Sequence, residues 1–522
     1  MCLMNSATEP SLSQAQRITQ LESSMTQLLD ENQQLKQQVN WFKKQLFGRK
    51  SEKRLVDDST HPSLFDESSS QKHKPTPKET ITYQRRKGKQ RSEGCVTEQG
   101  LRFDETVPVE VINIPAPELQ GEQAEQFEVI DEKVTRRLAQ RPGSYVVLEY
   151  RRPVVKHKAS QTLSTAAAPT AVLDNSIVDV SLLAGMLIDK FVYHLPLYRQ
   201  HQRLQQSGIT VSRASLTNWV QRALHLLSPI ANAQLQQVLQ SKVLAMDETP
   251  IKAGRKSKGK MKSTWFWPLY GERDEVVFGW SETRGSAYVK QRLKDFKGTL
   301  LTDGYAAYDC FAKNKPEMIL AQCWAHTRRY FIKAQDVEPE ASEQALQYIA
   351  KLYQNEEHIR KKQLDAQKKL DYRSQNSKSV VDDFFNWCHE QRQRIDLVNS
   401  NPLSTALTYV ANHQAQLMVY LSDPDVPIDT NHIERALRPI PMGKKNWLFC
   451  WSEVGAEQVA TIQTLLTTCK LQGVDPYRYL VDVLLQRISL HPARDVIELT
   501  PRLWKEKFAT NPLLSDLDRL GQ

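Results

Sequence analysis

Two aspartates in the sequence stand where carboxylates can meet. Asp247 ends an apolar run at residues 243–246, and Asp303 ends a second apolar run at residues 299–302. If both runs are strands of one sheet, their ends can bring the two carboxylates face to face. Converging buried carboxylates are unfavourable unless cations neutralise them. Two divalent cations held there can activate an attacking oxygen and stabilise a leaving oxygen in phosphodiester chemistry. Aspartate is also an ordinary residue at strand ends, so the pair alone does not define a site.

A third carboxylate is expected from a helix much further along the chain. Residues 429–439 read DTNHIERALRP, and an Asp or Thr at their start can cap a helix. Helical spacing places Asn431, Glu434 and Arg438 on one face. An ordinary ion pair between Glu434 and Arg438 is the alternative. The next segment, GKKNWLF, combines basic, amide and aromatic side chains, which suit a phosphate backbone with bases stacked beside it.

The elements that must position these residues follow the order of a mixed α/β domain. Alternating runs predict antiparallel strands at residues 265–269 and 276–280, joined by a turn. A helix is predicted at residues 286–296 and a further strand at 318–322, with a long helical region after it. Strand, hairpin, helix, strand, helix and strand is the order of a ribonuclease H-like domain.

The N-terminal part is predicted to contain three different kinds of segment. Apolar residues spaced three and four apart run from Ile18 to Leu46, with Asn32 at an a position, which predicts a coiled coil that joins two chains. A single amphipathic helix packed on its own domain is the alternative. Residues 49–100 are polar and basic, as in a solvated tether or an arm that contacts phosphate. Short alternating runs at residues 101–165 predict a small β-rich module.

Residues 175–238 return to helical spacing. A helix, a turn containing Gly208 and a second helix that begins after Ser212 match the outline of a helix-turn-helix. The same outline occurs in helical domains that do not bind DNA. If the second helix does bind DNA, Arg213 and Asn218 near its start are the residues expected to make the contact.

The overall composition favours an anionic partner. The 522 residues include 70 Lys and Arg against 60 Asp and Glu, which gives a formal charge of +10. No apolar run approaches the roughly 18 residues of a membrane span, and the first residues do not resemble a secretory signal. The seven cysteines are scattered without a CxxC pair, which argues against a disulfide framework. A cytoplasmic, nucleoid-associated protein is expected.

Several long motifs, in a fixed order, resemble those of one family. LFGRKSEK, HLPLYRQ, LAMDETP, LLTDGYAAY, CWAHTRRYF and NHIERALRPIPMGKKNWLF are similar to segments of the TnpC-type DDE transposases of the bacterial insertion-sequence family sixty-six. The resemblance implies that Asp247, Asp303 and Glu434 bind two Mg²⁺ ions, or Mn²⁺ in their place. It also implies cleavage of the element's DNA ends and strand transfer to target DNA.

The resemblance also implies a domain plan. The fold expected is a multidomain α/β protein: a ribonuclease H-like catalytic domain with a helical insertion, preceded by a coiled coil, a small β-rich module and a helix-turn-helix-like helical domain. The ranges are 13–48 for the coiled coil, 49–100 for the linker, 101–165 for the β-rich module, 175–238 for the helical domain, 240–335 and 428–455 for the two parts of the catalytic core, 336–427 for the insertion and 456–522 for a C-terminal helical region.

DNA contacts are predicted from basic segments beside the acidic residues. Six basic residues crowd residues 252–262, which could be a solvated hairpin loop or a contact to the DNA backbone. The aromatic residues at 447–451 could form a strand packed on the core or stack on a DNA end. Besides Arg213 and Asn218, the residues expected at DNA are Lys256, Lys258, Lys260, Arg328, Arg329, Asn431, Arg438, Lys444, Lys445 and Trp447.

Metal binding elsewhere is not expected. Cys323 and His326 supply two of about four ligands that zinc needs, so a structural or assisting role near the site is favoured. Members of the family commonly carry a cysteine-rich segment before the helical domain. Here Cys95 is the only cysteine between residues 51 and 309, so no structural zinc is expected.

The expected partners are DNA, a second copy of the chain through residues 18–46, and small accessory proteins of the same element. Two other functions stay open: a non-enzymatic DNA-binding protein derived from a transposase, and a structure-selective nuclease of the same fold.

Overall fold

The computed structural model describes most of the chain from residue 102 onward, together with Met25. The described segments are 102–103, 105, 107–120, 124–141, 143–169, 171–174, 176–257, 260–447, 450, 452–487 and 496–520. Apart from Met25, the predicted coiled coil and basic linker lie outside them. The chain divides into two compact units, and residues 330–345 and 395–406 are the larger described parts of the first. No described helix is long and apolar enough to cross a membrane.

The second unit begins with a four-stranded sheet in the segment where short alternating runs predict strands. Its strands are β2 (Val109–Asn113), β3 (Phe127–Arg141), β4 (Ser144–His157) and β5 (Leu163–Thr165). β3 and β4 form a long antiparallel hairpin, and β2 pairs parallel with the other edge of β4. One face is closed by a small core of Ala139, Val146, Leu148, Tyr150 and Leu517. This core joins the sheet to the C-terminal end of the chain.

Three helices follow in the order that the sequence predicts. They are α2 (Val180–Phe191), α3 (Leu197–Gln206) and α4 (Arg213–Val238). Gly208 has a φ of +81°, the left-handed conformation that glycine accepts readily, and it turns the chain between α3 and α4. The Ser212 hydroxyl accepts a hydrogen bond from the Ser215 amide at 3.0 Å and so caps α4. The helix, turn and helix are therefore present, and their binding role stays a prediction.

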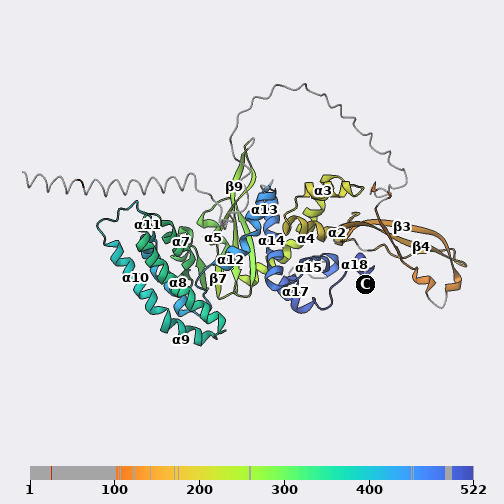
Figure 1. The fold of residues 1–522 in the computed structure, drawn as a ribbon. Coiled ribbons are helices and arrows are strands. Elements are labelled where there is room, and N and C mark those ends of the chain that lie inside the picture. Colours follow the sequence, from red (N-terminus) through yellow and green to blue (C-terminus); the bar gives the residue numbers. More distant parts are fainter. Residues whose placement is uncertain are drawn as a thin grey trace, which may run out of the picture. The chain divides into compact units, whose positions relative to one another are not determined.

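The centre of the second unit is a six-stranded mixed sheet (Figure 1). Its strands are β7 (Val243–Met246), β8 (Thr249–Ser257), β9 (Lys260–Gly271), β10 (Glu275–Ser281), β11 (Thr299–Thr302) and β12 (Ile319–Gln322). Along the main path the order is β10-β9-β7-β11-β12, and β8 pairs with β9. β7, β11 and β12 run parallel, whereas β9 runs antiparallel to its neighbours. The carboxyl ends of β7 and β11 therefore meet at one edge.

Two short helices connect the strands, and one of them differs from its prediction. They are α5 (Ser286–Arg292) and α6 (Ala306–Ala312). α5 ends at Arg292 rather than at residue 296, because Leu293 and Phe296 turn inward and are completely buried in the core. That core also contains Leu244, Trp267 and Leu300 from three different strands. It fixes the strand ends at which the two aspartates stand.

The predicted helical region after β12 is present. Its helices are α7 (Trp324–Ala334), α8 (Pro339–Lys361), α9 (Ala366–Asn376), α10 (Lys378–Arg392) and α11 (Pro402–Ser422). Trp324 is buried, stacks near Phe385 with ring centroids 6.2 Å apart, and donates its indole N–H to the Leu417 carbonyl at 3.0 Å. These contacts tie the start of α7 to α10 and α11.

The chain then returns to the sheet through α12 (Asn431–Leu437) and α13 (Pro439–Trp447). The interpretation of residues 447–451 as a strand is wrong for Trp447, which ends a helix. Its indole packs against Gly443, one helical turn earlier, where a Cβ would lie only 2.6 Å from the ring. Phe449 and Trp451 lie outside the described residues.

The C-terminal part consists mainly of helices. They are α14 (Glu453–Gln472), α15 (Pro476–Asp482), α17 (Pro501–Lys507) and α18 (Asp516–Leu520). As predicted, Gly473 and Pro476 separate the first two. α14 covers β10, the edge strand of the central sheet: the Thr464 hydroxyl accepts from the Phe278 amide at 2.9 Å, and the Thr468 hydroxyl accepts from the Val276 amide at 3.2 Å. Side chains of a helix thus replace the missing neighbour strand.

Replacing Thr468 with valine is expected to destabilise this packing. Thr468→Val keeps the shape of the side chain but leaves the Val276 amide and the Gln234 side-chain amide, which donates to the same hydroxyl at 2.7 Å, without that partner. The loss should be about 1–3 kcal/mol, the usual cost of leaving a buried polar group unsatisfied. Thermal unfolding followed by circular dichroism measures it. A Thr461→Val variant on the same helix is the control, and equal melting temperatures for the two variants would contradict the prediction.

Candidate active site

Asp247 and Asp303 lie side by side at the carboxyl ends of β7 and β11, two inner strands of the central sheet. β7 and β11 pair in parallel, with Ala245 opposite Leu301. Asp247 lies two residues after Ala245, and Asp303 lies two residues after Leu301. Burial raises the pKa of Asp247 to about 7, and the negative charge of Asp303 is the next largest cause. A smaller contribution comes from Glu434. The three carboxylates named from the sequence therefore interact electrostatically.

Glu434 reaches these strand ends from α12 and is held by α7. Its two carboxylate oxygens accept hydrogen bonds from the Arg329 guanidinium at 2.5 and 2.6 Å. The His326 Nε2 atom lies 3.0 Å from the same guanidinium and 3.8 Å from the Glu434 carboxylate. Burial, then the positive charge of Arg329, lowers the pKa of His326. The alternative ion pair between Glu434 and Arg438 is wrong, since the partner of Glu434 is Arg329.

The donor chemistry of the three carboxylates fits a divalent cation. Mg²⁺ and Mn²⁺ prefer carboxylate oxygens. Burial and the charge of Asp303 raise the pKa of Asp247, and a bound cation would offset both effects. As the side chains stand, no group of three or more His, Cys, Asp or Glu in the described residues is arranged to hold a metal ion. One reason is visible in the contacts: both oxygens of Glu434 are engaged by Arg329.

The backbone around Asp303 is fixed by residues that sequence reasoning missed. The Tyr409 hydroxyl of α11 donates a hydrogen bond to the Asp303 carbonyl at 2.7 Å, and the Gln322 side-chain amide donates to that hydroxyl. Gly304 has a φ of +85°, and a Cβ there would lie 2.7 Å from the Gln322 amide nitrogen. The turn after β11 thus requires glycine and is held by a tyrosine of the helical region.

Removing the Tyr409 hydroxyl is expected to slow the DNA cleavage that the sequence motifs imply, without preventing folding. Tyr409→Phe should reduce the cleavage rate by about 10- to 100-fold, the usual effect of losing a group that orients a metal ligand. The concentration of Mg²⁺ at half-maximal rate should rise as well, which a purely structural loss would not produce. Tyr420→Phe removes a hydroxyl from the same helix and serves as the control. An unchanged magnesium dependence in Tyr409→Phe would argue against this positioning role.

Glu248, the residue after Asp247, belongs to a buried hydrogen-bond network beside the two aspartates, and its charge contributes to the raised pKa of Asp247. Its carboxylate accepts hydrogen bonds from Arg284 Nε at 2.8 Å and from the Tyr308 hydroxyl at 2.9 Å. The Arg284 guanidinium lies 4.0 Å from the centre of the Tyr305 ring. Glu248 is therefore neutralised by protein groups and holds the end of β7 in place. The sequence shows an acid beside Asp247 but gives no sign of its partners.

Cys323 packs at the start of α12, in agreement with the structural role favoured from the sequence. Its buried sulfur accepts hydrogen bonds from the amide and the hydroxyl of Thr430, both at 3.2 Å. Burial raises the pKa of the thiol to about 11. These hydrogen bonds connect Cys323 to the residue before α12, the helix that carries Glu434.

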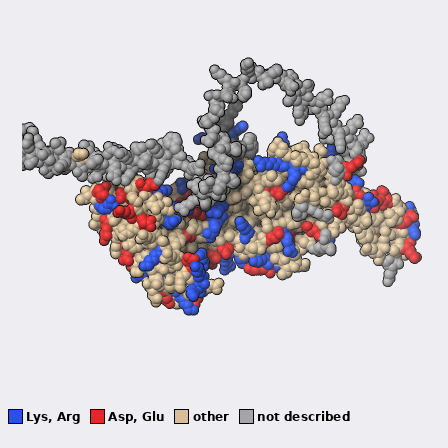
Figure 2. Space-filling view, in the orientation of Figure 1, with Lys and Arg blue, Asp and Glu red and all other residues tan. Residues whose placement is uncertain are grey.

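The residues predicted to contact DNA fall into separate groups. Arg213 and Asn218 are exposed at the start of α4, and Lys256 and Lys260 are exposed on the β8–β9 hairpin. Lys258 lies outside the described residues. In the last group, Arg328, Arg329, Arg438 and Lys445 are exposed, whereas Asn431, Lys444 and Trp447 are half-buried. On the face drawn in Figure 2, Lys and Arg side chains are interspersed with Asp and Glu rather than forming one continuous basic surface.

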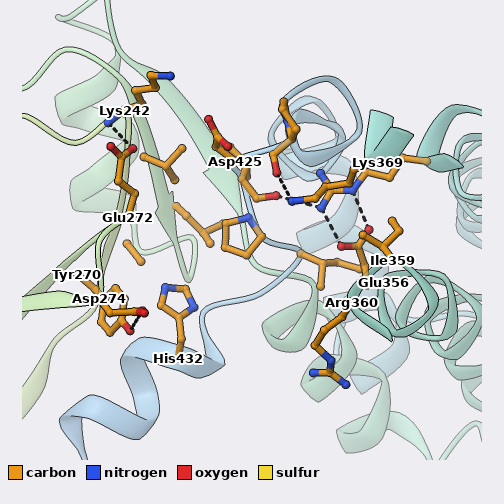
Figure 3. A pocket seen from close by; sticks show the side chains of 18 of the residues that line it. Lys242, Tyr270, Glu272, Asp274, Glu356, Ile359, Arg360, Lys369, Asp425 and His432 are labelled. Atoms are coloured by element: carbon orange, nitrogen blue, oxygen red, sulfur yellow. Dashed lines mark hydrogen bonds and ion pairs between the residues drawn. The ribbon is translucent and has the colours of Figure 1, made fainter. Parts of the chain in front are cut away.

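A cavity of about 810 Å³ lies on another side of α12 (Figure 3). His432 projects toward Tyr270 and Asp274 at one wall, and its ring lies 4.7 Å from the Tyr270 ring. Glu356, Ile359 and Arg360 of α8 lie at the opposite wall. The lining combines acidic and basic groups, several of them paired with one another. α12 therefore directs Glu434 toward the carboxylates of Asp247 and Asp303, and His432 toward this cavity.

Three parts of the chain match models of known protein families. Residues 175–458 match the family model described as Transposase IS66 family. Residues 464–502 match the IS66 C-terminal element, and residues 34–112 match a model described as Transposase C of IS166 homeodomain. The first match alone covers more than half of the chain. The chain therefore belongs to the IS66 transposase family, as its motifs predict.

Two relatives come from Sinorhizobium fredii (strain NBRC 101917 / NGR234). The uncharacterized protein y4qI is 29% identical over 390 residues, which cover 72% of this chain and 71% of the relative. The uncharacterized protein y4hP is 28% identical over 409 residues, or 74% and 73% of the two chains. Both relatives are described only as uncharacterized proteins.

Proposed function

We propose that the chain is a DNA transposase that cuts the ends of its element and joins them to target DNA by DDE chemistry. The observation that carries this proposal is that Asp247 and Asp303 follow adjacent parallel strands, with Glu434 of α12 near enough to affect the pKa of Asp247. The raised pKa of Asp247 supports it, because the other two carboxylates contribute to the shift. Membership of the IS66 transposase family supports it independently.

The catalytic domain is proposed to have a ribonuclease H-like fold. The sheet order β10-β9-β7-β11-β12, with only β9 antiparallel among its inner strands, supports this assignment. In this sheet β7 and β11 are neighbours, and this brings Asp247, which follows β7, beside Asp303, which follows β11. The helices between β12 and α12 are the proposed insertion that separates the two parts of the core.

Each residue of the site has a proposed role. Asp247 and Asp303 would be the principal metal ligands, and Glu434 would complete the second position. Two bound Mg²⁺ ions supply activation of the attacking oxygen and stabilisation of the leaving oxygen. Arg438, Lys444 and Lys445 would hold DNA phosphates. His326, hydrogen-bonded to Arg329, would orient that arginine.

The reaction would proceed by two in-line displacements at phosphorus without a covalent enzyme intermediate. Water attacks the phosphodiester at the element end, the bond to the 3′ oxygen breaks, and a 3′-hydroxyl is released. That hydroxyl then attacks a phosphodiester of target DNA, and the target's own 3′ oxygen leaves. The protein's part is to hold both strands and to exclude competing attack geometries.

A cleavage and strand-transfer assay tests the proposal. Purified full-length protein is incubated with Mg²⁺ and a plasmid that carries the native element ends. Cleaved and joined products support a transposase. Cleavage without joining favours a structure-selective nuclease, and specific binding without either product favours a DNA-binding protein derived from a transposase. Adding the small accessory proteins of the element separates that last outcome from a missing partner. Self-association through residues 18–46 is proposed as well, and light scattering of the intact chain tests it.

A further inference from the structure

A second cavity, of about 720 Å³, lies beside Glu434 and is lined by arginines. Its walls come from α7, α8 and the start of α12. The residues used below are Arg328 and Arg329 of α7, Tyr353 and Arg360 of α8, and Asn431 and Arg435 of α12. We call this cavity the arginine pocket. Arg329 connects this pocket to the candidate active site, because it lines the pocket and also binds Glu434.

The carboxylates in the lining of the arginine pocket are already engaged by other groups. Glu356 is bound by the buried Arg373 at 2.8 Å, and Glu357 by Lys361 at 2.9 Å. The third, Asp429, accepts hydrogen bonds from the Tyr353 hydroxyl at 2.9 Å and from the Asn431 amide at 2.5 Å. Glu356 and Glu357 are therefore paired with cations other than the arginines of the pocket, although the charge of Arg360 also lowers the pKa of Glu357. Asp429 keeps its negative charge, because both of its partners are neutral.

The remaining charge of the arginine pocket is positive. Arg328, Arg360 and Arg435 are exposed, and none of them forms an ion pair with a carboxylate that the structure describes. Three guanidinium groups face one carboxylate without a cationic partner, that of Asp429, so the cavity keeps a net positive charge that favours an anionic ligand. The planar fork of arginine matches the geometry of phosphate oxygens, and neutral donors such as Asn431 add hydrogen bonds of the kind found at DNA backbones.

We propose that the arginine pocket binds backbone phosphates of the DNA strand next to the phosphodiester that is cut. Arg360 of the helical insertion and Arg435 of α12 make the central contacts, so the insertion takes part in substrate binding. The identification of the ligand as DNA rests on the proposed function. The position of Arg329 supports this identification, because Arg329 lines the pocket and also binds Glu434 of the candidate active site.

The test measures DNA binding separately from cleavage. Full-length wild-type protein and the double variant Arg360→Gln, Arg435→Gln are titrated with a fluorescent duplex that carries the element end, in EDTA so that metal-dependent cleavage does not occur. Each lost phosphate contact should reduce the slope of log K against log salt concentration by about 0.9. The double variant should therefore show a slope smaller by about 2 and weaker binding at low salt. Arg392→Gln, an exposed arginine of α10 outside the pocket, is the control and should keep the wild-type slope.

A modified DNA shows which phosphates are bound. Duplexes with single methylphosphonate linkages, which lack the phosphate charge, are prepared at each position next to the cut. At the contacted positions wild-type binding should weaken, and the double variant should show no further loss, because the partner is already absent. If the double variant fails to fold, Arg360→Glu alone at its exposed position provides the same comparison.

The possible results separate this inference from the proposed reaction. An unchanged salt slope and unchanged affinity in a folded double variant, with normal cleavage by the wild type, would overturn the pocket assignment and leave the transposase proposal intact. A reduced slope in a protein that never cleaves would support the pocket and contradict the proposed reaction. Equal effects of methylphosphonates on wild type and double variant would also overturn the assignment.

Discussion

The Asp303→Asn variant is expected to lose DNA cleavage by more than about 100-fold, because removing even a residue that merely supports a metal ligand costs about 10- to 100-fold. Asparagine has the same shape as aspartate, so the turn held by Tyr409 and Gly304 should persist. What disappears is one of the negative charges that would hold the two proposed cations. The measurement is the rate of plasmid nicking at saturating Mg²⁺.

Two comparisons make this result specific to the candidate site. Asp295→Asn changes an exposed aspartate of the same unit whose side chain is 73% accessible, and it should cleave like the wild type. DNA binding in EDTA should be similar for wild type and Asp303→Asn, since the contacts to phosphate remain. Cleavage that persists undiminished in Asp303→Asn would mean that the activity comes from another site or another protein.

The second large effect is expected at a buried arginine of the helical region. Arg373 is 1% exposed and donates to both oxygens of Glu356 at 2.8 Å. It also donates to the carbonyls of Tyr420 at 2.5 Å and Asp423 at 3.0 Å. Arg373→Leu leaves a half-buried carboxylate and these carbonyls without their cation. The expected loss is about 3–5 kcal/mol, the usual cost of removing one partner of a buried ion pair.

Hydrogen exchange measures this loss where it occurs. Because a chain of this size need not unfold in one step, a single melting temperature is less informative than the protection of individual segments. Peptides from α9 and α11 should lose protection in Arg373→Leu, whereas peptides from α2 and α4 should not. Lys368→Leu, which removes a surface pair with Asp365 on the same helix, is the control and should change little. Unaltered protection of α9 would contradict the structural role of Arg373.

The sequence predicts the strands of the central sheet and the helix of Glu434 because those features are local, whereas the joint role of the three carboxylates stays a prediction. Apolar runs that end in Asp247 and Asp303 mark strands, and the spacing around Glu434 marks a helix face. The contacts that hold the site are not local. Arg329 and Glu434 are 105 residues apart, and Tyr409 and Asp303 are 106 residues apart. No periodic pattern links such pairs, so they become visible only in the folded chain.

The errors of the sequence predictions have similar causes. Alternation of aromatic residues after Lys445 is typical of a strand, but packing of Trp447 on Gly443 keeps α13 helical to that point. The pair between Glu434 and Arg438 satisfies helical spacing, yet an arginine of another helix reaches the carboxylate instead. The coiled coil at residues 18–46, the DNA contact of Lys258 and the roles of Arg213 and Asn218 stay predictions.

The ion pair between Arg329 and Glu434 has a consequence for the order in which ligands bind. If Glu434 binds a cation as proposed, Arg329 competes for the same two oxygens and lowers metal affinity as long as it stays. Any anion that draws Arg329 away raises metal affinity, and by thermodynamic reciprocity the metal raises the affinity for that anion by the same factor. DNA and divalent cations should therefore bind cooperatively, and a protein molecule without DNA should hold its metals weakly.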